Sequence, residues 1–253
     1  MLIDALQPLF IASYFAFCPS LDLNKLGIDE LSVYSDQIKD NQPTEMTKPS
    51  GQRIILVRHG ETEWNRLRRF QGHSDLPLNS KGNSQAQALA QALKNEAIDA
   101  IYSSPLKRAV GTAIRICRFH PSAPLIKKSG LKEMDLGDFE GIEAQQWAAQ
   151  HQEFRKAWEE NPADLAMPGG ESLRQVQLRA IDTLEQISES HESDCTLLIC
   201  SHNFVIVSML CFVSKISLNR FREFRQNTAA LNIFYKDGMN YQIKRINDCR
   251  HLL

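Results

Sequence analysis

The chain has 253 residues, of which 43% are hydrophobic and 23% are charged, values close to the average of globular proteins that exclude disorder throughout. Its formal net charge of −1 excludes a generally basic nucleic-acid binder. The charge is unevenly divided, because residues 1–45 hold seven acidic and two basic residues, a net of −5, which leaves +4 for residues 46–253. The mildly basic main part is compatible with a small anionic ligand.

The first fifty residues show no persistent helical or strand period, and two prolines near their end would interrupt a helix. Their longest apolar run, residues 9–18, has about half the length that a membrane span needs. No Lys or Arg precedes Lys25, so the cationic leader of a secretory signal is missing. We therefore expect residues 1–50 to be a loosely ordered extension. An alternative is that translation begins at Met46.

The six cysteines include no Cys-x-x-Cys pair, and no group of cysteines and histidines has the spacing of a zinc site. Cys200 and Cys211 lie in apolar runs, where a free thiol behaves as a small hydrophobic side chain. We expect reduced, buried cysteines rather than a disulfide framework, and a cytoplasmic protein without membrane contact.

From residue 51 onward, short aliphatic runs alternate with segments of helical spacing. Three runs have the pattern of strands buried on both faces: 54–57, 100–102 and 196–200. Four segments have the spacing of helices: 86–97, 106–117, 173–187 and 203–213. The chain closes with a predicted hairpin, whose strands are 231–235 and 241–246. This order predicts an α/β fold, a three-layer sandwich with a mostly parallel central sheet covered by helices on both faces.

Charged and polar side chains follow each of the three predicted strands. The first strand ends in Arg58-His59-Gly60, the second leads through a Ser-Ser-Pro segment to Arg108, and the third ends in Ser201-His202. Ligands of such sheets bind beyond the carboxyl ends of the strands. Guanidinium groups match phosphate oxygens, and an imidazole nitrogen can attack phosphorus. Each residue alone is more often structural, but together they predict an anion site that contains a nucleophile.

Five segments in this order resemble the motifs of the histidine phosphatase superfamily, the phosphoglycerate-mutase-like enzymes. They are Arg58-His59-Gly60-Glu61-Thr62 with Asn65, Ser103 to Ala113 around Arg108, Leu131 to Gly141 around an acidic residue, Pro168 to Ser172, and Ser201-His202-Asn203. The resemblance covers about residues 52–253, so residues 51–253 are expected to form a histidine phosphatase domain.

The resemblance implies a role for each strand-end residue. His59 would be the nucleophile that becomes phosphorylated, and Arg58, Arg108 and His202 would surround the phosphoryl oxygens. Glu133 would donate a proton to the leaving alkoxide and then activate the water that hydrolyses phosphohistidine.

The acidic segment contains rivals to Glu133. The residues alone leave Asp135, Asp138 and Glu140 as alternatives, and only the family position, Leu-x-Glu before Gly-Asp-Phe-Glu-Gly, favours Glu133. We assign the other three to capping and solvated loop charge.

Further candidates for substrate contact lie near the two histidines: Thr62, Asn65, Gln71 and Asn203. Thr62 has the alternative of capping the turn after Gly60, and Glu171 that of capping a helix rather than contacting a ligand. His73 is expected at the surface. No feature requires a metal or another cofactor, because the arginines would supply the positive charge.

Residues 134–170 interrupt the alternation of strands and helices and resemble the family's variable lid. Four side chains are spaced as on one face of a single helix: Trp147, His151, Phe154 and Trp158. We expect them to form the core of the lid rather than to contact the substrate. Both would hold if the inner face of the lid were the wall of the substrate pocket.

The expected function is hydrolysis of a small phosphorylated metabolite through a phosphohistidine intermediate. The main alternative is a 2,3-bisphosphoglycerate-dependent phosphoglycerate mutase, but such mutases carry a longer insertion and an aromatic-Gly pair after the acid. A non-catalytic regulatory domain is the second alternative, and it would require loss of a site residue, whereas all are present. We expect no nucleic-acid partner. The edge of the C-terminal hairpin is one candidate interface for a homodimer.

Overall fold

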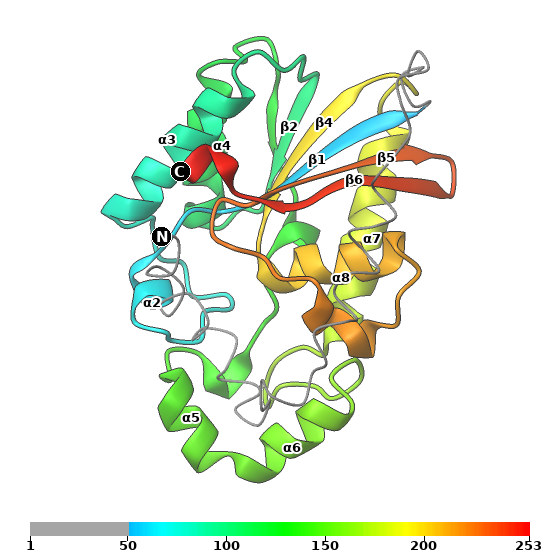
Figure 1. The fold of residues 1–253 in the computed structure, drawn as a ribbon. Helices are drawn as coiled ribbons and strands as arrows, with labels where there is room; N and C mark the ends of the chain where they lie inside the picture. The colour runs from blue at the N-terminus through cyan, green and yellow to red at the C-terminus, as the bar shows by residue number, and fades with distance from the viewer. Residues whose placement is uncertain (1–50) are drawn as a thin grey trace, which may run out of the picture. The chain divides into compact units, whose positions relative to one another are not determined.

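The computed structural model describes residues 51–253, so the expectations for residues 1–50, the Met46 start among them, lie outside the described residues. The described part forms a six-stranded sheet of order β3-β2-β4-β1-β5-β6 (Figure 1). Four strands are mutually parallel: β1 (Gln52–Arg58), β2 (Ala100–Ser103), β3 (Leu125–Lys127) and β4 (Thr196–Ser201). The hairpin strands β5 (Leu231–Asp237) and β6 (Asn240–Asp248) run antiparallel to β1 and to each other.

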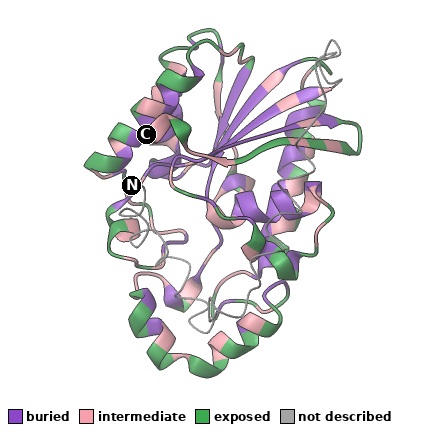
Figure 2. Ribbon diagram, in the orientation of Figure 1, coloured by how far each residue is buried: buried purple, intermediate pink, exposed green. Residues whose placement is uncertain are grey.

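Helices cover both faces of this sheet. On one face lie α3 (Ser80–Leu93) and α4 (Lys107–Cys117), and on the other lie α7 (Leu173–Glu189) and α8 (Asn203–Val213) (Figure 1). Successive side chains of a strand point to opposite faces. Accordingly Ile55 and Val57 pack with residues of α3 and α4, while Ile54 and Leu56 are equally buried. Strands β1, β2, β4 and β5 are buried along most of their length, whereas the edge strands β3 and β6 contain no buried residue (Figure 2). The predicted three-layer α/β sandwich is confirmed.

The remaining elements are short. Besides α2 (Glu63–Arg66), α5 (Ala144–Gln150) and α6 (Gln152–Glu160), they are the 3-10 helices η3 (Ser129–Leu131), η4 (Gly137–Phe139), η5 (Leu218–Glu223) and η6 (Arg250–Leu252). The helix expected over 86–97 is displaced toward the N-terminus. It begins where the Asn79 side chain accepts a hydrogen bond from the Gly82 amide, and it ends at Leu93.

The prediction of one continuous helix through the aromatic side chains of residues 134–170 is wrong. The chain leaves helical geometry at His151 (φ −120°, ψ 46°), which separates α5 from α6. The aromatic residues still form the interior of this segment: Trp147 and Trp158 are fully buried, and Phe139 packs on Trp147 and Phe154 with ring centroids 5.5 and 5.0 Å away. Packing against Phe139 therefore gathers Trp147 and Phe154, while Trp158 packs against Phe221 of η5 with ring centroids 6.2 Å apart. No single helix face is needed.

The five cysteines in the described part of the chain are free thiols, and Cys200 and Cys211 are buried as predicted. Over residues 51–253, no helix has both the length and the apolar character needed to cross a bilayer.

Candidate active site

The two histidines lie side by side at the carboxyl ends of the two central strands. In the parallel pairing of β1 with β4, Arg58 lies opposite Ser201, and the His59 amide donates to the Ser201 carbonyl over 3.1 Å. The residues after each strand therefore meet, and the ring centroids of His59 and His202 are 5.0 Å apart. Both side chains are buried, with 2% and 0% of their surface exposed.

The hydrogen bond of His59 determines which of its ring nitrogens can react. Nδ1 lies 2.7 Å from the Gly60 carbonyl, which can only accept, so Nδ1 carries the proton and Nε2 carries a lone pair. Burial lowers the pKa of His59 well below its usual 6.5, and the charges of Arg108 and Arg58 lower it further. His59 is consequently a neutral imidazole, the form that can act as a nucleophile.

His202 is held by two protein partners. The Arg108 Nε donates to its Nδ1 over 3.2 Å, so Nε2 carries the proton and donates to the Ser104 hydroxyl over 2.7 Å. Burial is the largest cause that lowers the pKa of His202 well below 6.5, and the charge of Arg108 lowers the pKa further. A direct contact between His202 and a phosphoryl oxygen would replace the hydrogen bond to Ser104.

The two arginines supply the positive charge beside these rings. Arg108, in the first turn of α4, is completely buried and also donates to the carbonyls of Gly72 and Ser74 over 2.7 and 2.8 Å. Burial lowers the pKa of Arg108 to about 10, which leaves the guanidinium charged at neutral pH. Arg58 donates to the Gln226 carbonyl. A phosphate-sized anion at this edge would therefore meet two fixed cations.

Gly60 is required because another chain segment passes close to its Cα. Its backbone does not adopt the left-handed conformation, but a Cβ there would collide with the Gly82 carbonyl at the start of α3. The Gly60 amide donates to the Thr112 hydroxyl of α4 over 3.1 Å. The loop that follows His59 is thus packed directly against two helices.

Glu133 is the buried carboxyl of the site. Only 4% of its surface is exposed, and its Oε1 accepts hydrogen bonds from the amides of Met134 and Phe204, both over 3.0 Å. Phe204 lies in the first turn of α8, directly after His202 and Asn203. Burial raises the pKa of Glu133 above its usual 4.5, because the charged form loses hydration.

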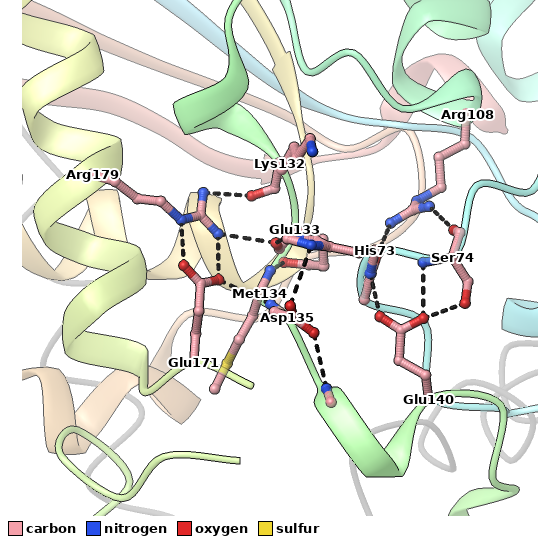
Figure 3. A network of polar contacts seen from close by, with 12 residues as sticks. His73, Ser74, Arg108, Lys132, Glu133, Met134, Asp135, Glu140, Glu171 and Arg179 are labelled. Carbon is pink, nitrogen blue, oxygen red and sulfur yellow. Dashed lines mark hydrogen bonds and ion pairs between the residues drawn. The ribbon is translucent and has the colours of Figure 1, made fainter. Parts of the chain in front are cut away.

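The three rival carboxylates have other positions. Asp138 is exposed, and Asp135 accepts from the Gly137 amide. Glu140 accepts from the amides of His73 and Ser74 and from the Ser74 hydroxyl (Figure 3). The geometry therefore distinguishes Glu133 from its neighbours, which the residues alone could not do.

The candidates in the loop after His59 bind one another. Thr62 caps α2 in a capping box with Asn65, as its alternative reading predicted, and the Thr62 hydroxyl also donates to Gln71 Oε1 over 2.7 Å. Gln71 Nε2 and Asn203 Oδ1 are buried atoms without a hydrogen-bond partner in the described part of the chain. Such atoms need a partner, and both residues are candidates for substrate contact.

Two expectations are corrected by the structure. Ser172, not Glu171, caps α7, and Glu171 instead pairs with Arg179, a residue that the sequence did not point to. His73 was expected at the surface, but it is half-buried and its Nε2 lies 3.0 Å from the Glu133 carbonyl. Arg179 lies in mid-helix, and no local pattern marks it. Residues 51–253 include no cluster of three or more His, Cys, Asp or Glu side chains arranged to hold a metal ion.

A neutral histidine close to the charges of two arginines, with a buried carboxyl of raised pKa at the same edge of the sheet, has the groups that phosphoryl transfer through a histidine requires. Comparison with known proteins gives the family, because residues 54–249 match the model of the histidine phosphatase superfamily (branch 1). The chain belongs to the histidine phosphatase superfamily, and it is a phosphatase.

Three similar proteins illustrate the relationship. Phosphoserine phosphatase 1 of Hydrogenobacter thermophilus is 34% identical, over 79% of this chain and 94% of the relative. The metal-independent phosphoserine phosphatase of Arabidopsis thaliana is 33% identical, over 79% and 82%. The crystal structure of a phosphoserine phosphatase mutant from Entamoeba histolytica in complex with phosphoserine has a TM-score of 0.69 and 26% identity, covering 80% of this chain and 100% of that one.

Proposed function

We propose that this phosphatase hydrolyses a small phosphomonoester through a phosphohistidine formed on His59. The observation that carries the proposal is the state of this side chain, whose Nδ1 is bound to the Gly60 carbonyl and whose neutral ring keeps a lone pair on Nε2. Nε2 would attack phosphorus and break the bond to the leaving oxygen. Arg58 and Arg108 would stabilise the charge on the phosphoryl oxygens, and loss of one such donor typically costs about 10²–10³ in rate.

Glu133 would transfer the protons of both steps. In the first step its neutral carboxyl gives a proton to the leaving alkoxide, and in the second its carboxylate removes a proton from the attacking water. The water oxygen then bonds to phosphorus, the bond to Nε2 breaks, and neutral His59 and protonated Glu133 are restored. The raised pKa of Glu133 supports this role, because it keeps part of the carboxyl protonated above pH 4.5.

O-phosphoserine is the first substrate to test, because the three similar proteins described above are named phosphoserine phosphatases. The unpartnered buried atoms of Gln71 and Asn203 support these residues as substrate contacts, with Thr62 and Asn65 orienting Gln71.

A phosphoglycerate mutase is the less supported alternative, since the three relatives described above carry phosphatase names. We also infer that residues 134–170 act as a lid and that the protein is cytoplasmic. The edge strand β6 is our candidate for a homodimer interface.

The test is hydrolysis of a panel of phosphorylated metabolites, O-phosphoserine, 3-phosphoglycerate and phosphoglycolate included, by the wild type and by His59→Ala, with a metal chelator present. His191→Ala is the matched control, because the His191 carbonyl accepts from Gln52 at the start of β1, the end of that strand remote from His59. The His191 side chain contacts only the Tyr102 hydroxyl and the Tyr102 ring among the described residues. We expect activity in the wild type and the control only. With a labelled substrate, both proteins should trap labelled phosphate in an acid-labile, alkali-stable linkage, as phosphohistidine would give. Equal activity of His59→Ala, or inertness of the wild type across the panel, would refute the proposal. Phosphoglycerate interconversion stimulated by the bisphosphate would identify a mutase.

A further inference from the structure

The segment that carries Glu133 is held by a single arginine of α7. Arg179 uses all five of its N–H donors, two on Glu171 and three on main-chain carbonyls, those of Gly130, Lys132 and Glu133. Figure 3 shows the bonds to Glu171, Lys132 and Glu133. The five distances lie between 2.7 and 2.9 Å. One side chain therefore binds three carbonyls of a four-residue stretch that has no regular structure beyond η3.

One of these bonds leads directly to the Glu133 carboxyl. The carbonyl that accepts from Arg179 and its following amide, Met134 N, belong to one planar peptide group. The same Met134 amide donates to Glu133 Oε1 over 3.0 Å. Because the peptide is rigid, fixing its oxygen fixes the direction of its N–H, and that direction orients the carboxyl. His73 reinforces the arrangement from the other side through its Nε2, 3.0 Å from the same carbonyl.

Glu171 orients the arginine and holds the far end of the segment. It pairs with Arg179 through both oxygens, over 2.8 Å each, and its Oε2 also accepts from the Asp135 amide over 2.9 Å. The Glu171 amide donates to the Asp135 carbonyl over 2.9 Å. The pair thus bounds the Glu133 peptide on both sides, while none of its hydrogen bonds reaches His59, His202 or Arg108 in the described structure. The charge of Arg179 is only the smallest of the causes that lower the pKa of His202.

We infer that Arg179, oriented by Glu171, is a positioning residue for Glu133 that serves proton transfer and not phosphate binding. The inference rests on the proposed function, in which Glu133 transfers the protons. Its consequence is selective: without Arg179 the carboxyl would lose its alignment with the leaving oxygen, whereas the nucleophile and the cations beside it would stay in place. A displacement of about 1 Å at a reacting group can cost about 10²-fold in rate.

The surroundings of the pair favour substitution without collapse of the fold. Arg179 and Glu171 line a cavity of about 440 Å³, together with Lys132 and Asp182, and each pair member keeps 23% of its side chain exposed. Water can therefore occupy the space left by a shorter side chain. We expect Arg179→Gln to fold, and Arg179→Lys and Glu171→Gln serve as milder changes at the same place.

The test compares two substrates that differ in their need for a proton donor. A p-nitrophenolate group leaves without a proton, whereas the alkoxide of O-phosphoserine, or of the best alkyl phosphate in the panel, needs one. kcat/KM is the quantity to measure, because it reports the steps up to release of the leaving group. The variants are Arg179→Gln, Arg179→Lys, Glu171→Gln and Glu133→Gln. Arg174→Gln, which removes an exposed arginine of the same helix from its pair with Asp164, is the matched control.

We expect Arg179→Gln to lower kcat/KM about 10²-fold for the alkyl phosphate and less than about tenfold for p-nitrophenyl phosphate. Glu133→Gln should show the same contrast more strongly, the two milder variants should show it more weakly, and the control should behave as the wild type. Equal losses on both substrates, or no loss, would overturn the inference. If Glu133→Gln itself showed no contrast, its role in the proposed function would fall, and the inference with it. If Glu133→Gln showed the contrast but neither the two Arg179 variants nor Glu171→Gln did, the inference about Arg179 would be overturned. The proposed role of Glu133 would stand.

Discussion

Burial of the Glu133 carboxyl should make the protein less stable as the pH rises, and Glu133→Gln should remove this cost. The substitution keeps the shape of the side chain and an oxygen that can accept from the Met134 and Phe204 amides. It replaces the other oxygen with an amide nitrogen, and so removes the negative charge and the proton that the carboxyl can exchange. The folded-state pKa is raised above 4.5, so the folded protein holds the proton at pH values where the unfolded chain has lost it. The stabilising contribution of neutral Glu133 is therefore fully present below pH 4.5 and is lost as the pH rises through the folded-state pKa.

The magnitude follows from the number of protons involved. One group changes the free energy of unfolding by at most about 1.4 kcal/mol per pH unit between the two pKa values. The difference in stability between Glu133→Gln and the wild type should therefore grow from about pH 4.5 with at most that slope. It should become constant once the pH exceeds the folded-state pKa. The variant is expected to be the more stable protein at neutral pH, although nearly inactive on alkyl phosphates.

Urea unfolding followed by fluorescence between pH 4.5 and 8 measures this difference. Glu153→Gln, an exposed carboxyl on α6, is the control and should differ from the wild type by the same amount at every pH. A difference between Glu133→Gln and the wild type that stays constant over this range would refute the reasoning. So would a wild type that gains stability over the variant as the pH rises.

Four further outcomes follow from the site and the core. Gly60→Ala should lose about 1–3 kcal/mol of unfolding free energy in urea titrations, because its Cβ would press on the Gly82 carbonyl. Trp158→Ala should lose about 3–5 kcal/mol in the same measurement, since this side chain is fully buried. Arg108→Lys should lower kcat about 10²–10³-fold in steady-state assays, because an ammonium cannot replace the forked guanidinium. The acid limb of kcat/KM, measured against pH, should lie well below 6.5, where protonation of His59 removes the nucleophile.

Those parts of the fold that depend on local pattern could be predicted from the sequence. Aliphatic runs such as 54–57 and 196–200 identify buried strands, and a strand that ends in a polar segment places that segment at the edge of the sheet. This was sufficient to bring His59 and His202 together. The three-residue strand β3 was missed, because Leu125-Ile126-Lys127 is too short to show a period.

Features that depend on tertiary contacts could not be predicted. The break at His151 lies within a helical pattern of aromatic residues, and only their tertiary packing, on Phe139 and on Phe221, shows why two helices suffice. Arg179 is a charged residue within an amphipathic helix, where a solvated position is the ordinary expectation. Its partners lie on a segment far away in sequence, so no spacing rule could connect them. The burial that distinguishes Glu133 from the other three carboxylates is likewise a tertiary property.

The pairing of β1 with β4 has a consequence for when the site forms during synthesis and folding. His59 lies in the early part of the chain and His202 in its last quarter. Their rings meet only when β1 and β4 are paired. A chain still being synthesised therefore has His59 but no completed site until β4 has emerged and inserted between β1 and β2. Hydrolytic activity should accordingly be the last property to appear during refolding, and nascent chains should be unable to consume metabolites of the cell that makes them.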